Sequence, residues 1–274
     1  MDTKIVRVFM TGILALFTGI SSGQNMDCKE MGLKGNVKSI SETQYKLNDI
    51  NPGLNEVLLT KFSFDKNCRK REEITTDVGG ELKNRHVVIY DKSGNISSEN
   101  RETPTVKGYF DTRYRYDASK RLSKKEVSSS GKLFATHIYY YDDRGNVSKK
   151  EIKKRQAYDV NDESFEYKYD ENNRLIEETH LDGKKYNRIE YKYNDKNQII
   201  RRAEHNERGG ITYETDYTYD ELDNPDTETS AYRGNKTFDY SYVYEYDSQG
   251  NWINKRSLSD EKTYSLQIRV ITYY

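Results

Sequence analysis

The sequence contains little of what catalytic and metal-binding proteins normally use. Its 274 residues include 4 His, 2 Cys and 1 Trp. No Cys-x-x-Cys, His-Glu-x-x-His, Gly-x-Ser-x-Gly or phosphate-loop pattern occurs in the chain. The acidic segment DVNDE (159–163) lacks the ligand spacing of known calcium loops, and a solvated turn explains it better. We therefore expect no catalytic residues, no metal site, no cofactor and no enzymatic activity.

The chain also lacks net charge and a large share of apolar residues. Lys and Arg together number 45, as do Asp and Glu, so the chain has no net positive charge that would attract nucleic acid. Only 34% of the residues are hydrophobic, which is too few for a conventional two-layer core. Disorder is nevertheless excluded, because the chain has 25 Tyr and only 3 Pro. An ordered structure built mainly from tyrosine is expected.

The long apolar run is confined to the N-terminus. Lys4 and Arg7 are followed by VFMTGILALFTGI and then by the small residues Ser21, Ser22 and Gly23. This order is typical of a secretory signal peptide over residues 1–23, and the run is too short for an uncleaved membrane anchor. We expect a mature N-terminus near Gln24 and a protein exported across the inner membrane, to the periplasm, the cell surface or the medium.

A nine-residue phrase recurs eight times, as in YKYDENNRL and YEYDSQGNW. Its Asp is preceded by an aromatic residue in every copy, with a second aromatic or Val three positions before the Asp and a mostly polar residue between. This period of two predicts a strand with one Tyr-rich, buried or half-buried face. The Asp position is occupied at intervals of 24 to 28 residues by Asp65, Asp91, Asp117, Asp142, Asp170, Asn194, Asp220 and Asp247.

A turn and a second strand follow each phrase. Gly, Asn or Asp stands three residues after the Asp in six of eight copies, and these residues tolerate positive φ, as a tight turn requires. An aliphatic residue or Trp usually follows two residues later. A charge comes three residues after that in every copy, so we expect the second strand to be anchored by one apolar residue and otherwise to face water. The charges are Glu73, Glu99, Lys125, Lys150, Glu178, Arg202, Glu228 and Lys255.

Each unit of about 26 residues is therefore one β-hairpin, and the chain is a meander. Residues 24–61 form an N-terminal half-repeat and cap, because GNVKSISETQY repeats the second strand without the first. Residues 62–274 hold eight hairpin repeats and a closing strand, QIRVITYY, which repeats the first strand. The predicted fold is all-β, with tandem antiparallel hairpins in one curved, twisted sheet; whether that sheet is open or closed stays undetermined.

The recurring phrase YxYDxxGN resembles the YD repeat, or RHS repeat, of bacterial surface and toxin proteins and teneurins. The resemblance covers about Phe62 to Tyr274. It implies long, spiralling β-sheets that wrap into a shell, here only a partial one, since eight repeats are few. A toxin-enclosing role is not carried over, because no toxin-sized segment follows Tyr274. An outer-membrane barrel is disfavoured, because EYKYD and KKEIKKR put charges where an apolar lipid-facing band should run.

Cys28 and Cys68 both lie near the N-terminal end of an exported chain, where a disulfide between them can persist. Such a bridge would hold the first hairpin in place. Two free thiols remain the alternative, because sequence alone does not fix the geometry.

Two functions fit these observations. The first is a secreted or cell-surface binding module whose Tyr-rich face takes a glycan or a protein. The second is a structural or adhesive spacer whose Tyr face packs on itself. Tyr side chains at the phrase positions should form two columns across the sheet, with members about 9.6 Å apart, close to a disaccharide step. The candidate ligand-binding residues are Tyr167, Tyr191, Tyr217 and Tyr244 in one column, Tyr169, Tyr193, Tyr219 and Tyr246 in the other, and Trp252.

Overall fold

The computed structural model describes residues 27–28, 31–47, 54–104, 108–155, 161–183 and 185–274. The predicted signal peptide, residues 1–23, lies outside the described residues. Among those that are described, no helix is long and apolar enough to cross a membrane.

Eighteen strands make up the structure and confirm the predicted all-β class. They are β1 (Val37–Leu47), β2 (Leu54–Phe64), β3 (Lys70–Thr76), β4 (Leu82–Tyr90), β5 (Ile96–Thr103), β6 (Gly108–Tyr116), β7 (Leu122–Ser129), β8 (Lys132–Tyr141), β9 (Val147–Lys154), β10 (Glu163–Tyr169), β11 (Leu175–Asp182), β12 (Lys185–Tyr193), β13 (Ile199–His205), β14 (Ile211–Tyr219), β15 (Pro225–Tyr232), β16 (Asn235–Tyr246), β17 (Trp252–Ser259) and β18 (Lys262–Tyr273).

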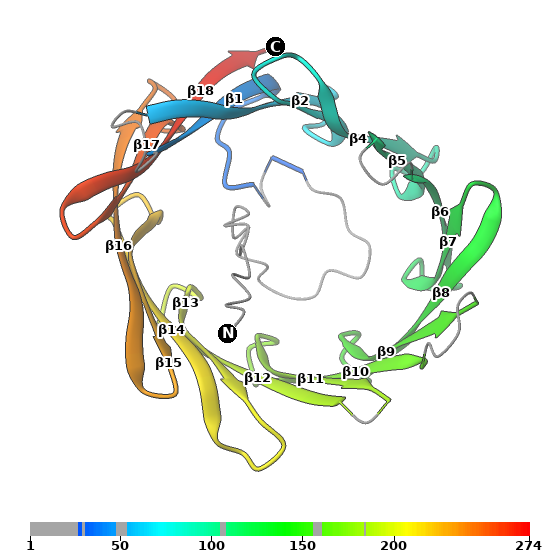
Figure 1. The fold of residues 1–274 in the computed structure, drawn as a ribbon. Coiled ribbons are helices and arrows are strands. Elements are labelled where there is room, and N and C mark those ends of the chain that lie inside the picture. The colour runs from blue at the N-terminus through cyan, green and yellow to red at the C-terminus, as the bar shows by residue number, and fades with distance from the viewer. Residues whose placement is uncertain (1–26, 29–30, 48–53, 105–107, 156–160, 184) are drawn as a thin grey trace, which may run out of the picture.

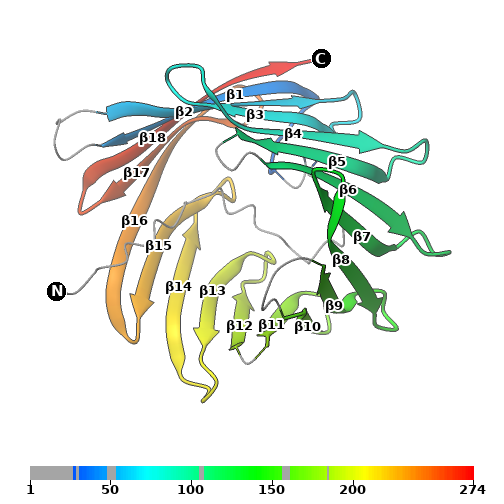
Figure 2. The ribbon, with the colours of Figure 1, turned by 45° about the vertical axis from the view of Figure 1, so that its right-hand side comes forward.

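The sheet closes into a barrel, which the sequence left undetermined. Every strand pairs antiparallel with its neighbours in sequence, and β18 pairs with β1, for example through Arg269 opposite Glu42. Figures 1 and 2 show the resulting ring, with the red C-terminal strand beside the blue β1. Closure removes the two exposed edges that an open sheet of this width would present to other chains.

The Asp turns follow the predicted chemistry. In the turn after β4, the Gly94 N–H donates to the Asp91 backbone carbonyl at 3.1 Å, with φ of 88° at Gly94. The Asp91 carboxylate also accepts backbone N–H groups of Ser93 and Asn95 at 2.8 and 2.9 Å. Even Lys120, which replaces Gly in its turn, adopts a φ of 62°. The turn is therefore imposed by the Asp and the hairpin rather than by glycine alone.

A bulge follows each of these turns and sets which side chains share a face. In the β6–β7 hairpin, Tyr116 lies opposite Leu122, but Arg115 lies opposite Lys124, so Ser123 is the extra residue. The bulge puts Leu122 on the face of Tyr116 and brings Lys125 to the same face, opposite Tyr114. The expectation that the charge of each repeat faces water is therefore wrong. The charge lies on the Tyr face, because the bulge reverses the alternation after the apolar residue.

The Tyr-rich face is the inner face of the barrel. The N-terminal segment, residues 31–36, runs inside the ring in Figure 1. Its Leu33, together with Cys28, packs in one cluster with Ile40 and Phe62, which lie on the same face as the tyrosines. Cys28 and Cys68 form a disulfide in this structure. It ties the N-terminal segment to the first Asp turn.

The two predicted Tyr columns are staggered rather than straight. Two strands across from Tyr167 stands Ile189, and Tyr191 is two residues further along β12. A step of two residues for every two strands means that the strands tilt by about 35° to the barrel axis. The column prediction is wrong in this respect, because it assumed a flat sheet without the stagger that closure requires.

Candidate functional site

The second Tyr of each phrase fastens its hairpin to the one before. The Tyr193 hydroxyl donates to the Leu175 backbone carbonyl at 2.7 Å, and Tyr219 does the same to Ile199 at 2.6 Å. The acceptor is the first residue of the preceding hairpin's second strand, which is apolar in every case except Lys70. We call this contact the Tyr staple. The same bond is made by Tyr90 to Lys70, Tyr116 to Ile96, Tyr141 to Leu122 and Tyr169 to Val147.

Two candidate residues depart from this rule at the last hairpins. Tyr246 donates to the side-chain carboxylate of Asp220 at 2.6 Å, so its acceptor carries a charge. Tyr244, from the other predicted column, donates to the Pro225 carbonyl at 2.8 Å and thereby takes over the staple. The hydroxyl groups of Tyr169, Tyr193, Tyr219, Tyr244 and Tyr246 are thus engaged in bonds within the barrel.

The remaining candidates differ in how much of the ring a ligand could reach. Tyr167 and Tyr217 are buried, with 6% and 8% of their surface exposed. Tyr191 is half-buried and lies opposite Arg202. Burial raises the pKa of all three phenols, so they stay neutral at physiological pH. The half-buried rings therefore offer more surface for stacking than the buried ones do.

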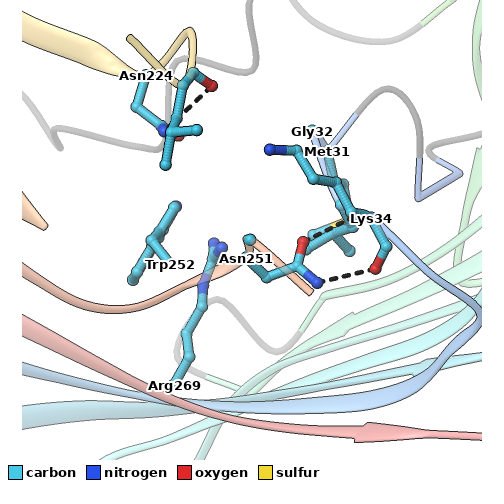
Figure 3. A pocket seen from close by; sticks show the side chains of 10 residues that line it. Met31, Gly32, Lys34, Asn224, Asn251, Trp252 and Arg269 are labelled. Carbon is cyan, nitrogen blue, oxygen red and sulfur yellow. Dashed lines mark hydrogen bonds between the residues drawn. The ribbon is translucent and has the colours of Figure 1, made fainter. Parts of the chain in front are cut away.

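Trp252 borders a small pocket at the Asp-turn end of the inner face. Figure 3 shows it with Arg269, Asn224 and the N-terminal residues Met31 to Lys34. The Arg269 guanidinium lies 3.4 Å from the centre of the Trp252 ring and covers one of its faces. Asn251 closes the pocket by bonding the backbone N–H and carbonyl of Lys34 at 2.7 and 2.8 Å. The pocket is small, with a volume of about 50 Å³, and can hold ordered water.

Between the Tyr rows runs a belt of charged side chains that the repeat places opposite the first Tyr of each phrase. Some of them, and a further pair where β1 meets β18, form ion pairs. Arg269 and Glu42 form a buried ion pair at 2.8 Å, Lys70 pairs with Glu73 at 2.9 Å, and Arg202 pairs with Glu204 at 2.7 Å. Buried charges in proteins are normally compensated in this way.

Lys125 and Lys150 form no ion pair with any residue that the structure describes. Lys125 lies over the Tyr114 ring at 5.2 Å, and Lys150 over the Phe165 ring at 3.7 Å. Between them on β8 stands His137, directly opposite Lys125. Burial lowers the pKa of both lysines. Burial, then the charges of Lys125 and Lys150, lowers the pKa of His137 to about 4.

The carboxylates near Lys125 and Lys150 either contact other basic side chains or have a raised pKa and so carry less negative charge. Glu99, beside Lys125, has its Oε2 3.3 Å from Nε2 of His86. Glu163 accepts from His180 at 2.9 Å and pairs with Lys154. Burial raises the pKa of Glu178, which makes it a poorer counter-charge for Lys150. The inner wall of β7–β9 is therefore short of negative charge.

His86 and His137 both lie on the Tyr face. Sequence reasoning missed Lys125 and Lys150 as site residues, because it placed them in water. Two Lys-Lys pairs, Lys124-Lys125 and Lys149-Lys150, were the signal that could have found them, since one lysine of each pair must face inward. No group of three or more His, Cys, Asp or Glu suited to a metal ion occurs among the described residues.

The outer face carries cross-strand ion pairs. Lys168 pairs with Glu177 at 2.7 Å across β10 and β11, and Glu177 also pairs with Arg188 of β12 at 3.1 Å. Arg115 reaches Glu126 at 3.2 Å, and Lys149 reaches Glu151 at 2.8 Å.

Comparison with known proteins finds no matching family model and no matching curated protein. Among solved structures, the chain is similar to a porin-like protein from Bacteroides uniformis, with 11% identity, a TM-score of 0.47, and coverage of 87% of this chain and 99% of that one. It is also similar to the TcdB2-TccC3-TEV structure, with 14% identity, a TM-score of 0.32, and coverage of 81% of this chain but 15% of that one. A third is a putative outer membrane lipoprotein-sorting protein domain from Vibrio parahaemolyticus, with 7% identity, a TM-score of 0.21, and coverage of 87% and 83%. All three scores are below 0.5, so the function is argued from the chain's own residues.

Proposed function

We propose that this chain is a secreted or cell-surface binding module, a short member of the YD-repeat (RHS-repeat) family, that binds a glycan or a polypeptide along its inner Tyr-rich face. The protein is exported, takes no cofactor, binds no nucleic acid and does not span a membrane after its signal peptide is removed. Its role is binding rather than catalysis.

The observation that carries this proposal is that Tyr rings on the inner face stay partly uncovered by the barrel's own side chains. A barrel of eighteen strands is wider than its own side chains can fill. Tyr191, Tyr193, Tyr219, Tyr244 and Tyr246 are only half-buried on that face. Tyr combines a flat apolar ring with a polar edge, which suits stacking on sugars and on extended peptides. A ligand that threads the barrel would meet such rings from several hairpins.

The outer face supports an aqueous surrounding. A charged residue facing lipid at mid-membrane costs about 2–4 kcal/mol in a transmembrane barrel. Lys168, Arg188 and Lys149 lie on the outer face together with their carboxylate partners. Such side chains are stable in water without further partners.

Ring removal tests the binding role. Tyr191→Ala and Tyr244→Ala remove rings that the proposal places against the ligand, whereas Tyr193→Phe removes only a staple hydroxyl and keeps its ring. Binding of the exported protein to glycan and peptide arrays should fall for the two Ala variants and persist for Tyr193→Phe. If no glycan or peptide binds the parent protein, and every variant only lowers the melting temperature, the binding role is wrong.

The Tyr staples favour a second candidate, the structural or adhesive spacer. Six hydroxyls bond the backbone of the preceding hairpin and so serve the barrel itself. In that case the Tyr face is packed for stability alone and has no ligand. The array experiment separates the two functions, since a spacer should bind nothing.

The absence of enzymatic activity is tested separately. A screen of glycosidase and protease substrates should show no turnover. Turnover abolished by one point substitution on the inner face would overturn this part of the proposal.

A further inference from the structure

The inner wall of β7–β9 carries two cations of the charged belt from consecutive repeats. Elsewhere on the inner face Arg269 meets Glu42 and Arg202 meets Glu204, while Lys255 lies over the rings of Tyr242 and Tyr244. On this wall, Lys125 and Lys150 come from consecutive repeats, and neither forms an ion pair with a residue that the structure describes. A half-buried ammonium group without a counter-ion is costly unless a ligand supplies the negative charge.

Aromatic rings accompany both lysines. Tyr114 lies beneath Lys125 and Phe165 beneath Lys150. The Phe165 ring is stacked on the His180 ring, with centroids 4.1 Å apart and an angle of 6° between the ring planes. Each cation is thus held beside a flat apolar surface, an arrangement suited to a ligand that alternates anionic groups with apolar ring faces.

The spacing of the two lysines sets the spacing of the anionic groups. Lys125 and Lys150 lie two strands apart, and Lys150 is displaced by two residues from the position directly across from Lys125. Their Cα atoms are therefore about 12 Å apart, close to one disaccharide step for side chains as flexible as lysine. His137 lies opposite Lys125, between the two, and its ring offers a further polar contact.

We propose that Lys125, His137 and Lys150 form an anion site on the inner wall, which holds an acidic glycan with one carboxylate or sulfate group per disaccharide. This inference rests on the proposed binding function and specifies its ligand class. Lys125 and Lys150 each take one anionic group, while Tyr114, Tyr139 and Phe165 line the sugar rings between them. Glu99 and Glu178, on the two sides of the lysines, confine the site to two anionic groups.

Two pairs of matched variants test the site. Lys125→Gln/Lys150→Gln removes the two inner charges. Lys124→Gln/Lys149→Gln removes two charges from the same strands, one residue away and on the outer face, where Lys124 and Lys149 pair with Glu126 and Glu151. Lys125→Arg/Lys150→Arg keeps the inner charges. Thermal unfolding of each variant establishes that it is folded.

The probes are hyaluronan oligosaccharides, with one carboxylate per disaccharide, chondroitin sulfate oligosaccharides, and neutral chitin oligosaccharides of equal length. The parent protein should bind an acidic probe more tightly than the neutral one, and binding should weaken with salt. The inner Gln variant should lose at least roughly tenfold in affinity for the acidic probe, from the loss of two charge-assisted hydrogen bonds. The outer Gln variant and the Arg variant should keep the parent affinity.

Three results would overturn the inference. Equal loss in the outer Gln variant would show that the acidic probe binds the outer face or the protein's charge in general. Tight binding of the neutral probe, reduced by Tyr191→Ala but not by the inner Gln variant, would refute the anion site and leave the binding function standing. Failure of every glycan and peptide to bind would refute both.

Discussion

The repeat wall, β4–β14, and the closing seam, β16–β18 with β1 and β2, are built from the same repeat but satisfy their inner polar groups differently. On the wall, a Tyr staple such as that of Tyr116 ends on a neutral backbone carbonyl, and Lys125 has no ion pair. At the seam, Tyr246 bonds a carboxylate and Arg269 is paired with Glu42, while Lys255 of β17 lies over the Tyr242 and Tyr244 rings and, like Lys125, forms no ion pair with a described residue. The charge-assisted contacts of Tyr246 and Arg269 lie where the two ends of the chain meet.

The seam joins residues that are 227 positions apart, whereas a hairpin of the wall joins neighbours. Bringing the two ends together loses more chain entropy than forming a hairpin does. Charge-assisted bonds, roughly twice as strong as neutral ones, compensate for this at the seam. The wall is held by local hairpins, so its inner lysines are not needed to hold its strands together.

The largest expected effect comes from breaking the seam ion pair. Arg269→Met leaves the Glu42 carboxylate buried without a partner and should lower the free energy of unfolding by about 3–5 kcal/mol. Lys125→Met on the wall should leave it unchanged within about 1 kcal/mol, because it removes an uncompensated charge. Urea denaturation measures both.

The double variant Glu42→Leu/Arg269→Met serves as the control for this prediction. It should recover most of the stability, since no charge then stays unpaired. Equal losses in Arg269→Met and Lys125→Met would contradict the contrast between seam and wall.

The next effect concerns the disulfide that ties the N-terminal segment to the seam. Cys28→Ser/Cys68→Ser should cost about 2–4 kcal/mol, as expected for the loop of 40 residues that the bridge closes. Reduction of the parent protein should give the same shift in its denaturation midpoint. Labelling of both thiols in unreduced, folded protein would show that no bridge forms.

A smaller contrast is expected between two Tyr staples. Tyr246→Phe removes a bond to the Asp220 carboxylate and should cost about 2 kcal/mol, whereas Tyr116→Phe removes a bond to a neutral carbonyl and should cost about 1 kcal/mol. Both changes keep the ring, so thermal unfolding reports the hydroxyl alone. Equal costs would mean that the seam gains nothing from its charged acceptor.

The effect that is smallest near neutral pH is a pH dependence that belongs to the wall. The folded pKa of His137 is about 4, below its usual 6.5, so the unfolded chain takes up a proton first as the pH falls. His137 thus makes stability fall between pH 6.5 and 4, by about 1 kcal/mol or less at pH 6. Subtracting the stability profile of His137→Asn from that of the parent should isolate this loss. A flat difference over that range would contradict the lowered pKa.

Sequence alone predicted the candidate Tyr residues on one face but not the lysines among them. Tyr191 and Tyr193 follow from strict alternation within one strand, which is a local property. Lys125 does not, because the bulge at Ser123 reverses the alternation after Leu122. A bulge has a weak sequence signature, so the charge of each repeat was assigned to the wrong face.

The sequence by itself determined the eighteen-strand, all-β meander and its Asp turns, because alternation and turn chemistry act within a few residues. The curved sheet was expected to have its Tyr-rich face on the concave or inner side, and only the tertiary structure decided that the sheet closes. It also decided the stagger of the columns, which is two residues per hairpin from Tyr167 to Tyr217 and four residues from Tyr217 to Tyr244. These features depend on the pairing of β1 with β18, through contacts such as that of Glu42 with Arg269. No local pattern encodes the register between strands that lie at opposite ends of the chain, since it is fixed by the geometry of closing the whole ring.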